Sequence, residues 1–198
     1  MATAPKVPLS LEEHALNNLR YIRDMVDRAR PVTLVPGWGG VAMGLTALLA
    51  TWIAAQQTTR EAWLLTWEVE VVIAVLVGAT ALWWKARQSN ERLGNANVRK
   101  FGLAFAPPIV AGALITAKLH TGGPVELLPG LWMCLYGAAV TAGGLHSVAI
   151  VPIMGACFVA TGAVALFVPF TAAQWLMAAA FGGLHIGFGL AIARRHGG

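Results

Sequence analysis

Six long runs of hydrophobic residues follow a polar N-terminal segment in this chain. We place the runs near residues 36–56, 62–84, 101–119, 126–146, 148–168 and 172–193. Each run has about the 17–25 residues that an α-helix needs to cross the hydrocarbon core of a bilayer. The pattern predicts an all-α integral membrane protein in which residues 35–198 form a six-span transmembrane bundle.

Residues 1–34 have a different pattern, which predicts a cytoplasmic amphipathic helical arm. Apolar residues recur there every three or four positions, at Leu11, Ala15, Leu19, Ile22 and Val26. A capping box at Ser10 and the proline at position 31 bound the predicted helix at about residues 10–30. Its four Arg balance four acidic residues. A neutral helix with one apolar stripe favours packing on another protein helix, and a helix lying in the membrane interface is the alternative.

The basic residues are distributed unevenly, and their distribution orients the spans. Twelve of the fourteen Lys and Arg lie in residues 6–30, 85–100 and 194–195, and the other two are Arg60 and Lys118. Basic loops remain on the cytoplasmic side of a membrane. We therefore expect a multi-pass protein of the bacterial inner membrane with both termini in the cytoplasm, which requires an even number of crossings.

The composition agrees with a membrane location and argues against other classes. The chain is 57% hydrophobic and 12% charged, whereas soluble domains carry about 25% charged residues. The topology accounts for the basic pI of about 9.8, so we expect no nucleic-acid partner. Cys134 and Cys157 lie in apolar runs without metal-binding or redox spacing, and we interpret them as small packing residues.

An internal repeat is one further feature of the pattern. Residues 104–120 align with residues 180–196 when one gap is allowed, and Pro36-Gly37 and Pro129-Gly130 both precede a span. Two halves of three spans each would be related by inverted topology, because three is odd. Chance similarity between Gly- and Ala-rich helices is the alternative.

The second span carries two carboxylates, Glu68 and Glu70. Glu70 lies about 12 Å below the predicted outer end of its helix, from eight residues at 1.5 Å each. A carboxylate at that depth is costly and should face protein or water. Glu70 is therefore a candidate proton or cation site, with Glu68 as a weaker one. The structural alternative pairs Glu70 with Lys118 or with a hydroxyl group.

Two histidines lie beside glycines in similar GGLH sequences. His185 is near the middle of the last span, and His146 is at the inner end of the fourth. Paired transmembrane histidines are typical of b-haem sites. However, these two differ in depth by about 9 Å, from six residues at 1.5 Å each, which is awkward for two ligands of one iron. The alternative is a core His185 hydrogen-bonded to another helix and a capping His146.

Small residues recur four positions apart, at Gly40 with Gly44 and at Gly183 with Gly187. Such faces let membrane helices approach closely, within one chain or between chains. Pro107-Pro108, in turn, predicts a break or a kink in the third span. Finally, Trp63, Trp132 and five further Trp are expected near the two membrane interfaces, with Trp67 about one turn deeper.

Three stretches carry a resemblance to a known group of proteins. They are LRYIRDMVDRARPVTLVPGWG, YGAAVTAGGLHSVAIVPIMG and FGGLHIGFGLAIARRHGG. Together they resemble an uncharacterised family of bacterial multi-pass membrane proteins. The resemblance implies a helical membrane fold, but it implies no activity, ligand or site residue.

Two classes of function therefore compete. The first is a non-enzymatic accessory or structural membrane subunit that self-associates or binds a membrane partner. The second is a small proton- or cation-coupled transporter or channel that uses Glu70 and His185, and a b-haem cytochrome is a lesser alternative. The sequence has no catalytic triad, zinc-protease motif or phosphate loop, so we expect neither catalytic residues nor a metal site.

Overall fold

The computed structural model describes residues 16–23, 35–88, 96–145 and 147–196. It divides the chain into two units, Met1–Val32 and Thr33–Gly198, close to the predicted boundary at residues 34 and 35. In the first unit, residues 16–23 are helical, and Leu19 and Ile22 of the predicted stripe are exposed. The ends of the predicted helix and its capping box lie outside the described residues.

The described part of the second unit is helical and contains no strand. Its elements are α2 (Gly37–Ala54), α3 (Arg60–Gln88), α4 (Ala96–His120), η1 (Val125–Leu127), α5 (Leu128–Gly144), α6 (Ile150–Ala165), α7 (Phe170–Met177), η2 (Ala178–Leu184) and α8 (His185–His196). η1 is a short 3₁₀ turn that leads into α5. η2 is π-helical and joins α7 to α8 in one long helix. Each of the six predicted segments is therefore helical.

Five of these helices are long and apolar enough to cross a membrane. They are α2, α3, α4, α5 with η1, and the continuous α7–η2–α8 helix. The segment predicted at residues 148–168 is shorter than expected, because α6 has 16 residues. At 1.5 Å per residue it is about 24 Å long. The fold is thus that of a helical, membrane-embedded protein with at least five helices of spanning length.

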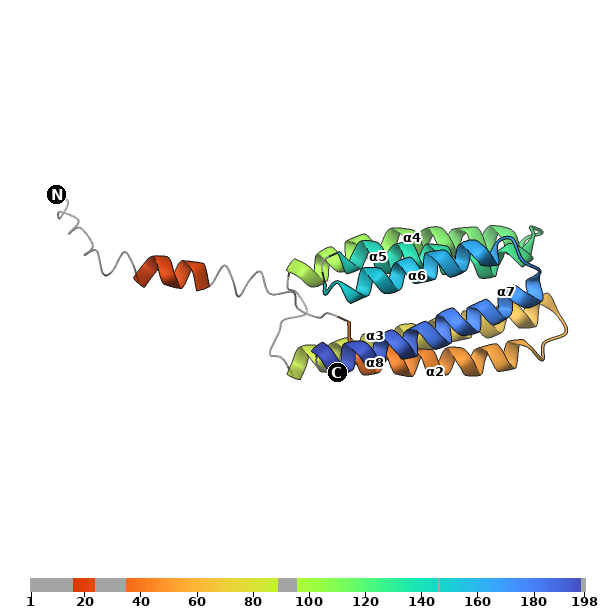
Figure 1. The fold of residues 1–198 in the computed structure, drawn as a ribbon. Helices are drawn as coiled ribbons and strands as arrows, with labels where there is room; N and C mark the ends of the chain where they lie inside the picture. The colour runs from red at the N-terminus through yellow and green to blue at the C-terminus, as the bar shows by residue number, and fades with distance from the viewer. Residues whose placement is uncertain (1–15, 24–34, 89–95, 146, 197–198) are drawn as a thin grey trace, which may run out of the picture. The chain divides into compact units, whose positions relative to one another are not determined.

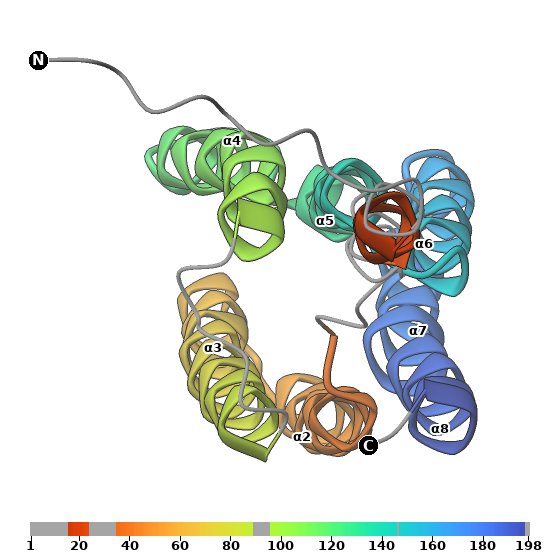
Figure 2. The ribbon, with the colours of Figure 1, turned by 90° about the vertical axis from the view of Figure 1, so that its left-hand side faces the viewer.

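The helices of the second unit form two layers (Figure 1). One layer holds α4, α5 and α6, and the other holds α2, α3 and the α7–η2–α8 helix. Within the layers, α5 lies between α4 and α6, and α2 lies between α3 and α8 (Figure 2). The layers meet where α7 and η2 pack against α5 and α6.

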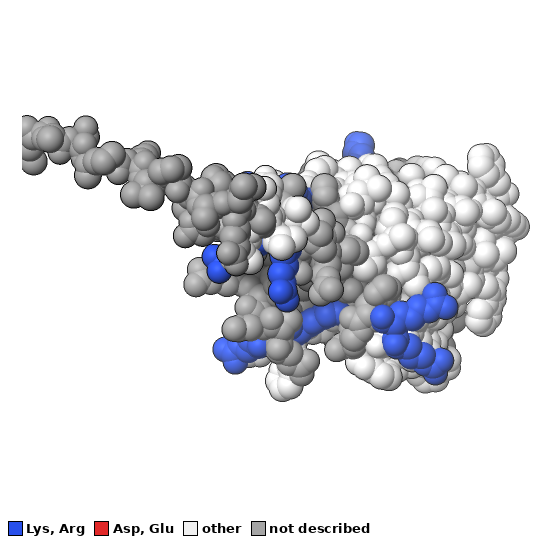
Figure 3. Space-filling model, turned by 60° about the vertical axis from the view of Figure 1, so that its left-hand side comes forward, with Lys and Arg blue, Asp and Glu red and all other residues white. Residues whose placement is uncertain are grey.

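Successive helices run in opposite directions, which gives the bundle two ends (Figure 1). We call one the turn end; it holds the α2–α3 turn, η1 and the start of α7. The other, the terminal end, holds the first residues of α2 and the last residues of α3 and α8. Lys and Arg gather at the terminal end, which comes forward in Figure 3; the described ones are Lys85, Arg87, Arg99, Lys100, Arg194 and Arg195.

Glycines set the closest helix contacts. A Cβ atom built on Gly155 of α6 would lie 2.6 Å from the backbone nitrogen of Thr141 on α5, and one on Gly137 would lie 2.7 Å from the nitrogen of Val159. On the other layer, Gly37 of α2 comes equally close to the backbone of Ala193. Any larger residue would push these helices apart, so the α5–α6 and α2–α8 pairs depend on glycine.

Aromatic side chains fill the space between the two layers. Trp63 and Trp67 of α3 meet Trp132 of α5, and the rings of Trp63 and Trp132 are stacked with centroids 5.5 Å apart. We define the aromatic core by its nine rings, which are Phe105, Trp63, Trp67, Trp132, Tyr136, Phe158, Phe170, Phe181 and His185. Trp63, which the sequence predicts near a membrane interface, is only 4% exposed, because its ring packs against other rings between the layers.

The expected break at Pro107-Pro108 is absent. α4 runs from Ala96 to His120 with both prolines inside it. No described residue of α4 is buried, and Pro107 lies on its exposed side. The helix packs mainly against α5.

Candidate functional site

Glu70 is a buried carboxylate between α3 and α2. Its residue is 6% exposed, and its Oε1 accepts a 2.8 Å hydrogen bond from the Thr46 hydroxyl of α2. The same hydroxyl lies 2.9 Å from the carbonyl oxygen of Met43. Of the two partners considered from the sequence, the structure shows a hydroxyl; Lys118 is exposed near the end of α4.

Glu68 lies on a different side of the same helix and is exposed. Two residues along a helix are separated by about 200°, so neighbours at this spacing cannot share a proton. The structure thus separates the two carboxylates, and Glu70 alone is enclosed by protein.

His185 is held by hydrogen bonds on both ring nitrogens. The residue is 5% exposed. Its Nε2 lies 2.7 Å from the Tyr136 hydroxyl of α5, and its Nδ1 lies 2.9 Å from the carbonyl oxygen of Phe181. Because the Phe181 carbonyl can only accept, Nδ1 donates to it. A neutral ring then accepts the Tyr136 proton at Nε2. Phe158 and Phe181 complete the surroundings of the ring.

The helix changes its winding directly before His185. Residues Ala178–Leu184 are π-helical, and α-helix resumes at His185. One-turn π-segments inside α-helices are frequent at functional sites, because they redirect side chains and loosen the regular hydrogen-bond ladder. Here the segment brings Phe181 and His185 into contact with Tyr136 on the neighbouring layer.

The two candidate proton-carrying groups belong to separate networks. Glu70 bonds to α2, whereas His185 bonds to α5 and to its own helix. Between them lie aromatic rings, with Phe181 6.1 Å from Trp67 and 6.3 Å from His185 by ring centroids. The described side chains therefore do not form a continuous polar path from Glu70 to His185.

The haem hypothesis meets an obstacle at His185. Iron would have to bind Nε2, which Tyr136 occupies, or Nδ1, which the Phe181 carbonyl occupies. The second ligand candidate, His146, lies outside the described residues. Among the described residues, no group of three or more His, Cys, Asp and Glu side chains is placed to hold a metal ion. As arranged, His185 is a hydrogen-bonded core residue.

The four glycines predicted to pack helices fall into two classes. A Cβ on Gly44 would lie 2.7 Å from the Gly182 carbonyl oxygen, and one on Gly40 would lie 3.3 Å from Gly189. These two are used inside the chain, between α2 and the η2–α8 helix. Gly183 and Gly187 are exposed, and a Cβ on either would meet nothing within 4 Å. We call these two positions and the exposed Ala179 before them the bare face.

Sequence reasoning missed the partners of both buried polar residues. Thr46 and Tyr136 carry no motif, and each lies in a different segment from the residue it bonds. One signal was present in part: a buried polar group in a membrane must find a partner on another helix. The sequence gives no register between helices, so it could not say which hydroxyl would be that partner.

Comparison with models of known protein families, with characterised proteins and with solved structures gives no match. The resemblance to a bacterial membrane-protein family therefore stays a prediction.

The His185–Tyr136 bond can be tested by removing a single oxygen atom. Tyr136→Phe leaves a buried imidazole nitrogen without its donor, and we expect the free energy of unfolding to fall by about 1 kcal/mol. Tyr21→Phe is the matched control, because Tyr21 is exposed on the N-terminal unit. The measurement is denaturant unfolding in detergent. Equal stability of the two variants would contradict the expected contribution of this bond.

Proposed function

We propose that this protein is a non-enzymatic, polytopic membrane protein that associates with other membrane helices through the bare face. The partner helix belongs to a second copy of the chain or to a larger membrane complex. The observation that carries the proposal is the open space beside Gly183 and Gly187. In this role the chain is an accessory or structural subunit.

The contrast with Gly44 supports this use of the bare face. Membrane helices gain little from apolar burial alone, so they associate where small residues let their backbones approach. The α2–α8 contact at Gly44 follows this rule within the chain. Gly183 and Gly187 have the same four-residue spacing as Gly40 and Gly44. They lie on the long helix that packs against α2, yet the described residues leave them uncovered. A partner helix there would repeat the packing that already holds α2.

The architecture that we propose for the bundle has six crossings in two inverted halves. The first half is α2, α3 and α4, and the second is α5, α6 and the α7–η2–α8 helix. α2 packs on α3 of its own half and on α8 of the other half, and α5 packs on α6 of its own half and on α4 of the other half. Each first helix thus touches the second helix of its own half and the third helix of the other half. This arrangement, together with the basic terminal end, supports both termini in the cytoplasm of a bacterial cell.

Enlarging the bare face should abolish association without harming the fold. We expect Gly183→Leu and Gly187→Leu to shift the purified protein from an oligomer, or from a complex with its partner, to a monomer. The shift is measured by mass photometry after extraction in a gentle detergent.

Gly102→Leu is the matched control, because Gly102 is exposed on α4 with nothing within 4 Å of an added Cβ. Gly44→Leu is the opposite control and should unfold the bundle. A wild-type protein that is monomeric and without partners would contradict the proposal, as would unchanged assembly of both bare-face variants.

A second candidate function is proton- or cation-coupled transport at Glu70. The observation that favours it is a carboxylate enclosed at depth with a single hydroxyl partner among the described residues. Carboxylates inside membrane spans are expensive and commonly mark ion or proton pathways. The packed aromatic core speaks against a continuous polar path, so the accessory role ranks first.

The transport candidate predicts a specific loss. In reconstituted vesicles, Glu70→Gln should abolish a pH-dependent ion flux, because an amide cannot exchange a proton at the same position. Glu68→Gln should leave the flux unchanged, since Glu68 is exposed and on another side of the helix. Flux is followed with a pH-sensitive dye trapped in the vesicles. Equal flux in wild type and Glu70→Gln, or no flux in wild type, would remove Glu70 from any transport mechanism.

A further inference from the structure

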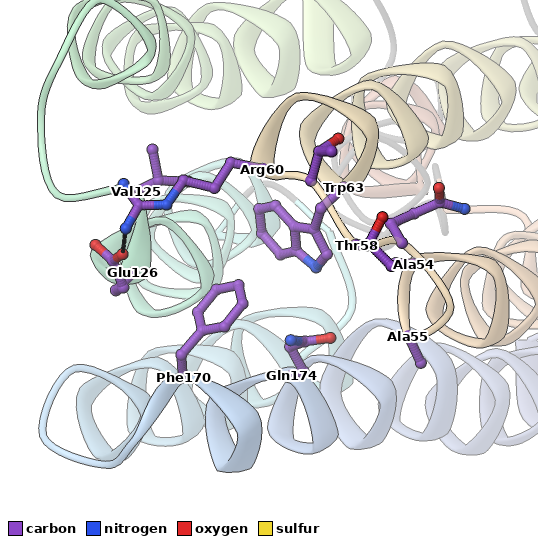
Figure 4. Close-up of a pocket in the computed structure, with 11 residues that line it drawn as sticks. Ala54, Ala55, Thr58, Arg60, Trp63, Val125, Glu126, Phe170 and Gln174 are labelled. Carbon is purple, nitrogen blue, oxygen red and sulfur yellow. Dashed lines mark hydrogen bonds and ion pairs between the residues drawn. The ribbon is translucent and has the colours of Figure 1, made fainter.

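A pocket of about 200 Å³ opens at the turn end of the bundle (Figure 4). Three connections that are distant in sequence form it: the α2–α3 turn, η1 and the first turns of α7. Its lining combines both signs of charge, side-chain amides and aromatic rings, from Arg60, Glu126, Gln57, Gln174, Trp63 and Phe170. Neither the association through the bare face nor the Glu70 chemistry uses these residues.

Two of the residues that line this pocket, Arg60 and Glu126, form an ion pair. Arg60 Nη2 lies 2.5 Å from Glu126 Oε1, and the two side chains are 65% and 45% exposed. This contact uses one of the five guanidinium N–H groups and one carboxylate oxygen, so both residues can bind a further group. A ligand that carries a single charge would be attracted by one of these two side chains and repelled by the other, because their charged atoms lie only 2.5 Å apart. A ligand with adjacent positive and negative groups matches both.

The wall of the pocket contains unused hydrogen-bonding groups. Trp63 is 4% exposed, and its Nε1 is buried without a hydrogen-bond partner among the described residues. Buried donors without partners are rare, and each calls for an explanation. In Figure 4 the nitrogen edge of this indole is turned toward the half-buried Gln174. An acceptor atom entering beside Gln174 would satisfy the indole N–H.

The position of the pocket indicates where its ligand comes from. Trp52 and Trp175 are exposed near the same end, at 64% and 68%. Exposed Trp residues at the ends of membrane helices lie at the level of the lipid headgroups. The pocket, at the ends of α2, α3 and α7, is therefore at headgroup level and not in the hydrocarbon.

We propose that this pocket binds a small zwitterion, with its ammonium group on Glu126 and its phosphate or carboxylate on Arg60. An acceptor oxygen of the same group reaches Trp63 and Gln174, and Phe170 provides an apolar wall. The membrane supplies this chemistry as the phosphoethanolamine headgroup of a phospholipid. A free zwitterion of the same kind is the other source, and the experiment below separates the two.

The test is native mass spectrometry of the delipidated full-length protein, titrated with defined lipids. We expect phosphatidylethanolamine to be retained about tenfold better than phosphatidylglycerol, which lacks the ammonium group. Tenfold is the scale of one charge-assisted hydrogen bond. The double variant Arg60→Gln/Glu126→Gln should lose this preference, and Gln174→Leu should weaken it while leaving the ion pair in place. Lys118→Gln is the matched control, because Lys118 is an exposed cation near the same end.

The outcomes are distinct. Competition by free O-phosphoethanolamine would support the proposal with a soluble zwitterion as the source, and a preference that resists it would support the lipid. Thermal unfolding of the variants checks that the fold is intact, which is expected because an exposed ion pair contributes about 0–1 kcal/mol. Equal retention of both lipids by wild type, or an unchanged preference in the double variant and in Gln174→Leu, would overturn it.

Discussion

In the hydrocarbon region of a bilayer there is no water to hydrogen-bond a peptide group. A chain there must satisfy every backbone N–H and C=O by itself, and α-helices do this within one segment. This constraint explains why each of the six hydrophobic segments is helical and why the turns gather at the two ends of the bundle. It also limits what the helices can carry inside, because every polar side chain placed there needs a protein partner.

The two buried polar residues considered for function show how that limit is met. Glu70 uses the Thr46 hydroxyl on α2, and His185 uses the Tyr136 hydroxyl on α5. Both bonds join different helices, so they fix register as well as satisfy a group. The rest of the interior is aromatic and glycine-lined. Rings fill the wide space between the layers, while glycines close the narrow contacts within each layer. The interior between the layers is thus filled largely by aromatic side chains.

The sequence predicted the helical segments well because their signal is local. Hydropathy over about 20 residues is enough to find a spanning helix, and the basic residues mark one end of the bundle. The shortness of α6 was harder to predict, since the residues after Ala165 are also apolar although the helix has ended. The continuous α4 was missed because an interior proline costs a helix stability without always ending it, and both prolines lie inside α4.

The candidate site was only half predictable. Glu70 and His185 stand out as polar residues in apolar runs, but their partners depend on which helices are neighbours. The same holds for the glycines. Gly44 and Gly183 have the same local pattern, yet one is covered by the η2–α8 helix and the other is bare. Likewise, nothing local brings Arg60 to Glu126, which are 66 residues apart in the chain.

The central claim is that the two ends of the bundle face opposite sides of a membrane. It is tested most directly by labelling single cysteines with a membrane-impermeant maleimide, in a variant with Cys134 and Cys157 replaced by alanine. Thr58→Cys reports on the turn end, and Arg195→Cys on the terminal end. In bacterial spheroplasts we expect Thr58→Cys to be labelled at once and Arg195→Cys only after permeabilisation. Labelling of both positions in intact spheroplasts, or recovery of the protein in the soluble fraction, would contradict the account.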